Sequence, residues 1–287
     1  MTTVAEQVQY ESRLRFRFAV TAFAAAVFLV VSQLLQLSGT QPPVNEATVS
    51  LITENARATT DTIATVSDML GLFALAGLLF WLHRSSQARA PQLRSASRWS
   101  ASGGAVIAGL MALIYTILFV SKAHQFVTTG DQSWPQADHL FSSALWIYPQ
   151  LVLELGNLML AVGAILIALS AMRVGLVPRI VGYAGVVSGA LFIIGIPVIT
   201  PVIQGFWLAA TAVVLAGRWP SGDPPAWEAG AAVPWPPTQR QQVQQQRSRQ
   251  PRGGRRRVSD KAVLAAVEKH ETPPNPQAGR SKRKRRK

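Results

Sequence analysis

Residues 18–37 read FAVTAFAAAVFLVVSQLLQL and contain no charged side chain. A transmembrane helix needs about 20 mostly apolar residues, because a helix rises about 1.5 Å per residue and the hydrocarbon core is about 30 Å thick. The run is longer than the apolar core of a secretory signal peptide, about 7–15 residues, and no Ala-x-Ala cleavage site follows it. It therefore predicts an uncleaved membrane anchor.

Further apolar stretches follow, two of which carry a single acidic residue, Asp68 in one and Glu154 in the other. The last stretch, residues 179–217, is twice as long as one span, and Gly195, Pro197 and Pro201 interrupt it. Because proline removes a backbone donor, we divide this stretch into two short spans. The sequence thus predicts an all-α polytopic integral membrane protein, a six-helix bundle with spans at residues 18–37, 63–82, 103–121, 144–169, 179–194 and 201–217.

Charge is concentrated at the end of the chain. Only 15% of the 287 residues are charged, against about 25% in a soluble domain. Residues 1–217 hold 11 Lys and Arg against 9 Asp and Glu, whereas residues 218–287 hold 17 against 5. We therefore expect an N-terminal tail at 1–17, a membrane domain at 18–217 and a disordered Pro/Gln/Arg-rich tail at 218–287, with a short helix at 259–270. The absence of cysteine excludes disulfide-stapled domains, cysteine metal sites and thiol enzymes.

Lys and Arg also predict the orientation, because short cytoplasmic loops are enriched in them. The loops predicted on the opposite side hold only Arg57 and Lys122, each with acidic residues nearby. The alternation predicts a multi-pass membrane protein with both termini in the cytoplasm. The arginines on the predicted cytoplasmic side before residue 218 are Arg13, Arg15, Arg17, Arg84, Arg89, Arg94, Arg98, Arg173 and Arg179.

Residues 171–179 read AMRVGLVPR and lead into a helix with Gly182, Gly185 and Gly189. This pattern resembles a bacterial integral membrane family, the 4386-type domain of unknown function, whose members carry a similar short cytoplasmic turn before a glycine-spaced helix. The resemblance covers residues 150–217. It implies a protein of the bacterial cell membrane and its architecture, but it implies no chemistry, and no catalytic residue can be carried over from it. Small residues let helices approach closely, and we favour contacts within the bundle over a dimer interface. The oligomeric state stays open.

Polar side chains gather in the outer half of the predicted spans, which indicates an outward-facing polar cavity and argues against an ion channel. Glu154 lies near the middle of its span, with Asn157 at i+3 on the same face. The alternatives are a buried Glu154–Asn157 pair bonded to a neighbouring helix, an Asp68 held by the helix dipole, and a Lys122 that either snorkels to the interface or pairs with Asp68 or Glu154. The cavity candidates are Asp68, Tyr115, Lys122, His124, His139, Glu154, Asn157 and Gln204.

These residues favour a non-enzymatic membrane protein that acts as a sensor, scaffold or binding subunit. We expect no cofactor and no metal, since no HExxH or similar ligand spacing occurs. One alternative is a small secondary transporter coupled to protons through Glu154, because the two sets of three spans run in opposite senses. Another alternative is a metal-dependent membrane hydrolase that uses His124 and His139.

The basic tail predicts contacts with anionic lipid head groups or with a cytoplasmic protein, because each Lys or Arg near a membrane surface contributes about 1 kcal/mol. Nucleic acid is the less favoured partner, since no aromatic residue follows Trp235 to stack on bases. A solvated tail that only enforces topology is the further alternative. The residues expected to make these contacts are Arg252, Arg255, Arg256, Arg257, Arg280, Lys282, Arg283, Lys284, Arg285, Arg286 and Lys287.

Overall fold

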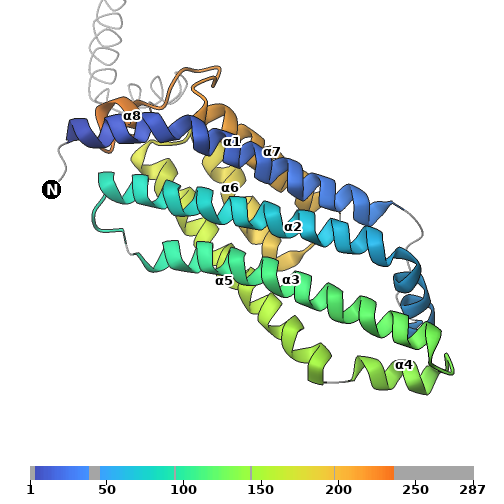
Figure 1. The fold of residues 1–287 in the computed structure, drawn as a ribbon. Coiled ribbons are helices and arrows are strands. Elements are labelled where there is room, and N and C mark those ends of the chain that lie inside the picture. Colours follow the sequence, from blue (N-terminus) through green and yellow to red (C-terminus); the bar gives the residue numbers. More distant parts are fainter. Residues whose placement is uncertain (1–3, 39–45, 94, 143, 197, 236–287) are drawn as a thin grey trace, which may run out of the picture. The chain divides into compact units, whose positions relative to one another are not determined.

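The computed structural model describes residues 4–38, 46–93, 95–142, 144–196 and 198–235, and the regular elements of these ranges are all helices (Figure 1). The described residues belong to one compact unit that ends at Trp235. The helix predicted at 259–270 and the tail cations predicted to contact lipid or nucleic acid lie outside the described residues.

Four helices are long and apolar enough to cross a membrane by length and composition: α1 (Val4–Leu37), α2 (Ala47–Arg89), α3 (Ala96–Thr128) and α5 (Ala144–Val174). Two shorter apolar helices follow them, α6 (Arg179–Ile194) and α7 (Ile199–Leu215). The remaining helices are α4 (Trp134–Phe141) and α8 (Pro225–Ala229). The prediction of an all-α, multi-pass membrane protein is thereby confirmed, and each predicted span falls within or largely overlaps one of these helices.

The surface of the bundle supports the same conclusion. Large apolar side chains stand exposed on helices that cover a buried core, for example Phe23 of α1, Ile117 of α3 and Phe206 of α7, which are 58%, 53% and 63% exposed. Exposed apolar surface on this scale is unusual for a protein in water, and it suits contact with lipid. The helices satisfy their own backbone groups, as a hydrocarbon environment requires.

Small residues hold α3 against α5. A Cβ atom placed on Gly104 would meet the backbone nitrogen of Leu160, and one on Gly163 would meet the backbone nitrogen of Ala101. On α6, Gly185 lies against Trp207 and Ala168 of the neighbouring helices. Gly185 and Gly189, which the sequence spaces four residues apart, therefore serve contacts within the bundle, as the sequence favoured. Such close approaches increase van der Waals contact where lipid supplies no hydrophobic driving force.

The hairpin between α6 and α7 forms where glycine and proline interrupt the apolar stretch. Gly195 caps α6 with a φ of 59°, a left-handed conformation that glycine adopts without the steric cost of a Cβ. The next helix begins at Ile199, so that Pro201 stands in the first turn of α7, where its missing N–H is harmless. The two short helices pack against α5 and α1, respectively.

A small second cluster of apolar side chains lies beyond the predicted spans. At 43 residues, α2 is about 65 Å long, so its first turns extend past a bilayer core. There Leu51 packs with Ala123 and Phe126 of α3 and with Ala137 of α4. Before α4, the backbone N–H and the hydroxyl of Ser133 both donate to Asp131, at 3.1 and 2.8 Å, and these hydrogen bonds lower the pKa of Asp131.

Residues 218–235 depart from the prediction that the disordered tail begins at residue 218. This segment forms α8 and packs beside the beginning of α1 (Figure 1), with Ala226 and Trp227 buried in the main apolar core. The backbone N–H of Val233 donates to the carbonyl of Val174 at 3.2 Å. The boundary predicted at Gly217 was therefore wrong. The prediction rested on the proline-rich composition of the segment, and an average composition does not indicate that one tryptophan, Trp227, is buried. Residue 4 likewise already belongs to α1, so residues 4–17 are helical.

Candidate functional site

A polar cavity of about 420 Å³ lies between α1, α2, α5, α6 and α7, at the end of the bundle where α6 and α7 are joined. We call it the Asp68 cavity. Its wall includes Gly195 and Ile196 of the α6–α7 hairpin, and Leu29, Leu72, Leu191 and Phe192 supply apolar surface. Its polar lining consists of Ser32, Gln33, Gln36, Asp68, Asn157, Thr200 and Gln204.

Several of these polar groups lack a protein partner. The side chain of Gln204 is 5% exposed, yet its Nε2 has no hydrogen-bond partner, and neither has the buried Oγ1 of Thr200. In contrast, Gln36 Nε2 donates to Ser32 Oγ at 3.2 Å. Buried polar groups are nearly always satisfied by protein, water or a ligand. The unsatisfied atoms therefore indicate that the cavity holds water or a polar solute.

Asp68 provides the charge of the cavity. It is half-buried on α2 and has no ion-pair or hydrogen-bond partner among the described residues. Among the described residues that line the cavity, none is Lys, Arg or His. A carboxyl group without a protein cation, next to apolar walls, is costly to keep ionised unless water or a cation approaches it.

The structure brings together three of the eight residues that the sequence singled out: Asp68, Asn157 and Gln204. Glu154 lies outside this cavity with its side chain exposed, although it is only three residues from Asn157. Lys122 pairs with neither Asp68 nor Glu154 in the described part of the chain.

The aromatic and histidine candidates also lie away from the Asp68 cavity. Tyr115 packs against Phe119 on α3, with ring centroids 6.3 Å apart. His124 Nδ1 lies 3.3 Å from Asn55 Oδ1, and His139 is exposed on α4. Within the described ranges, no group of three His, Cys, Asp or Glu side chains is arranged to hold a metal ion.

The contribution of α1 to the cavity was missing from the candidate residues. Ser32, Gln33 and Gln36 line it together with Leu29. Their spacing of three and four residues places them on one face at the end of the first predicted span. This spacing could have indicated from the sequence that the three residues line a cavity, since three polar residues on one face of a membrane span seldom face lipid.

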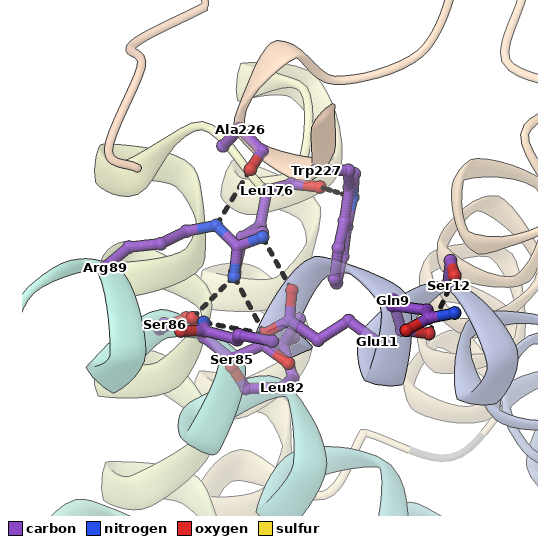
Figure 2. Close-up of polar contacts among 11 residues, drawn as sticks. Gln9, Glu11, Ser12, Leu82, Ser85, Ser86, Arg89, Leu176, Ala226 and Trp227 are labelled. Carbon is purple, nitrogen blue, oxygen red and sulfur yellow. Dashed lines mark hydrogen bonds and ion pairs between the residues drawn. The ribbon is translucent and has the colours of Figure 1, made fainter. Parts of the chain in front are cut away.

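A buried ion pair lies at the opposite end of the bundle, between Glu11 of α1 and Arg89 of α2 (Figure 2). Arg89 Nη2 donates to Glu11 Oε2 at 2.6 Å, and Nη1 donates to Oε1 at 3.0 Å. The same guanidinium donates to the carbonyls of Ser85 and Ala226, both at 2.9 Å. Bidentate pairing plus two further hydrogen bonds satisfies a charge that the protein has removed from water.

Trp227 of α8 completes this group, which we call the Arg89 cluster. Its indole Nε1 donates to the carbonyl of Leu176, in the turn between α5 and α6, at 3.0 Å (Figure 2). Its ring stacks on Trp81 with centroids 5.4 Å apart, and the guanidinium of Arg89 lies 5.1 Å from its centroid. Cations over an indole ring are attracted by its electrostatic quadrupole. The cluster thereby ties α1, α2, the α5–α6 turn and α8 together.

A second ion pair fixes the segment that leads into α8. Arg15 of α1 donates to both carboxylate oxygens of Asp223, at 2.8 and 3.1 Å, and to the carbonyl of Val214 at 2.8 Å. Apart from Arg15 Nε, which is buried without a hydrogen-bond partner, these charged groups are paired, and they enclose no reactive arrangement. We therefore assign the Arg89 cluster a structural role and take the Asp68 cavity as the candidate functional site.

Comparison of the chain with family models, with curated proteins and with solved structures finds no match. The family resemblance of residues 150–217 accordingly stays a prediction.

Proposed function

We propose that this protein is a non-enzymatic membrane protein that binds a small polar solute in the Asp68 cavity, as a sensor or a binding subunit. The observation that carries the proposal is a cavity of about 420 Å³ in which polar side chains of four helices converge and the Nε2 of the buried Gln204 has no partner. Ligand cavities have volumes of about 300–1,000 Å³ with few, well-placed polar groups. The volume therefore suits a solute of a few heavy atoms.

The proposed orientation places this cavity on the outer side of a six-span bundle. The arginine distribution of the loops supports this orientation. The lengths of α6 and α7, 16 and 17 residues, are near the lower limit for a membrane span and support the count of six spans. The Arg89 cluster then faces the cytoplasm in a bacterial cell membrane. The segment after Trp235 would start from this fixed point, and its basic residues would meet anionic lipid or a cytoplasmic protein.

Thiol labelling tests whether the cavity is filled with water, because the chain contains no natural cysteine. We expect Asn157→Cys to react with a hydrophilic maleimide in permeable membranes at a rate near that of Asp131→Cys, which lies in an exposed loop. Ala161→Cys is the matched control, since Ala161 is 0% exposed one turn further along α5. An Asn157→Cys variant as unreactive as Ala161→Cys would contradict a solute-binding cavity.

A further inference from the structure

A second polar cavity, of about 320 Å³, adjoins the Asp68 cavity. We call it the Glu54 cavity. Gln36 of α1 lines both cavities, which makes this residue part of their common wall. The other residues that line the second cavity are Thr53, Glu54, Arg57, Asp61, Thr65, Thr116 and Phe119. The two cavities together form a polar surface from the first half of α2 down to Asp68.

The acidic residues of this surface follow one face of α2. Glu54, Asp61 and Asp68 are spaced by seven residues, two helical turns, so successive carboxyl groups lie about 10 Å apart along the helix axis. Arg57 is the one cation on this surface among the described residues that line it. Its Nη2 donates to Asp61 Oδ1 at 3.0 Å and to the backbone carbonyl of Gln36 at 2.7 Å.

The surface therefore holds three carboxyl groups against one guanidinium, although burial raises the pKa of Glu54 to about 7. Arg57 pairs with Asp61, and Asp61 lies two turns of α2 before Asp68, so the deeper carboxyl group of Asp68 has no protein cation among the described residues. A groove of one sign of charge with low-dielectric walls concentrates solutes of the opposite sign. An anion would meet unfavourable potential at Asp68, which has no protein cation beside it among the described residues.

Gln204 supplies an independent indication of a ligand, since it is more than nine-tenths buried, lines the Asp68 cavity and has an unpartnered Nε2. The amide oxygen and nitrogen of glutamine exchange places by rotation of the side-chain amide. Gln33, Asn157 and Gln204 can thus each present an oxygen to an N–H donor held by Asp68.

We infer that the solute is a small organic cation with N–H donors, of the ammonium or guanidinium class, which passes the Glu54 cavity and binds at Asp68. This inference rests on the proposed function and adds the charge of the solute to it. The carboxyl group of Asp68 provides the counter-charge, and the side-chain amides accept hydrogen bonds from the donors. Gln36, between the two cavities, lies on the path.

The test compares guanidinium with urea, which has nearly the same shape and no charge, as protectants of Asn157→Cys against the maleimide. We expect guanidinium chloride to slow the labelling in a concentration-dependent manner and urea to leave the rate unchanged. In the Asp68→Asn background the protecting concentration should rise about tenfold, because the counter-charge is lost from a partly buried site. Glu154→Gln is the matched control, since it removes an acid outside the cavity and should leave protection intact.

The outcomes separate the two proposals. If Asn157→Cys fails to react at all, the solute-binding cavity itself is wrong. If it reacts and guanidinium and urea act alike, or sodium acetate protects as well as guanidinium chloride does, the cavity stands and the inference of a cation is overturned. Protection that persists unchanged in Asp68→Asn would equally overturn it, because the carboxyl group would then not hold the solute.

Discussion

Replacement of Arg89 by alanine is expected to lower the free energy of unfolding by about 3–5 kcal/mol, because it leaves the carboxylate of Glu11 buried without its partner. Arg89 and Glu11 have side chains that are 0% and 6% exposed, so water cannot replace the lost contacts at low cost. The measurement is the SDS-induced unfolding of the purified protein in detergent micelles. Arg89→Lys should recover little of the loss, since an ammonium group cannot donate to both carboxylate oxygens in the same planar arrangement.

Arg84→Ala is the matched control for this prediction. Arg84 lies on the same helix as Arg89, but its side chain is exposed and makes no ion pair within the described residues. Its removal should change the stability by no more than about 0.5 kcal/mol. The double variant Glu11→Ala/Arg89→Ala should be less destabilised than the sum of the two single variants, because it buries no unpaired charge. Equal effects of Arg89→Ala and Arg84→Ala would show that the buried pair does not form.

Gly103→Ala and Gly104→Ala are expected to change stability in opposite directions. A Cβ atom on Gly104 would lie 2.7 Å from the carbonyl oxygen of Gly156 and 2.9 Å from the carbonyl carbon of Met159, so α3 and α5 would have to move apart. Overpacking of this kind costs about 1–3 kcal/mol. A Cβ atom on Gly103 would meet nothing within 4 Å, and alanine should stabilise the helix there by up to about 1 kcal/mol.

The same unfolding titration, run on both glycine variants, checks the packing of α3 on α5. Both variants make the same Gly→Ala change at neighbouring positions of α3. The effects of helix propensity and of detergent are therefore common to both and cancel in the difference between them. Two variants of equal stability would mean that Gly104 does not face α5 as described. A destabilised Gly103→Ala variant would mean that the face of α3 that packs against the bundle is not the one described.

The positions of the membrane helices were predictable from the sequence because a bilayer imposes one length and one composition on every span. The rotation of each helix was less predictable. Glu154 and Asn157 share a face by spacing, but Gly156 and Gly163 pack against α3 and fix the rotation of α5. Asn157 consequently lines the Asp68 cavity, and Glu154 is exposed outside it.

The end of the folded unit escaped prediction for a different reason. Composition describes a segment as an average, and residues 218–235 have the glycine and proline content of a tail. The contacts of Trp227 nevertheless make this segment part of the folded unit, since its ring stacks on Trp81 and its indole N–H donates to the carbonyl of Leu176. Likewise, no local pattern pairs Glu11 with Arg89 across 78 positions, because such a contact exists only once α1 lies beside α2.

Side-specific labelling of the two ends of the bundle tests the central claim, a six-span bundle with an outward-facing cavity, most directly. Ile196 lines the Asp68 cavity at the α6–α7 hairpin, and Glu228 is exposed on α8 near the Arg89 cluster. In intact cells, we predict that Ile196→Cys reacts with a membrane-impermeant maleimide and that Glu228→Cys reacts only after the membrane is made permeable. An Ile196→Cys variant that needs permeabilisation, or a Glu228→Cys variant that reacts in intact cells, would contradict the account.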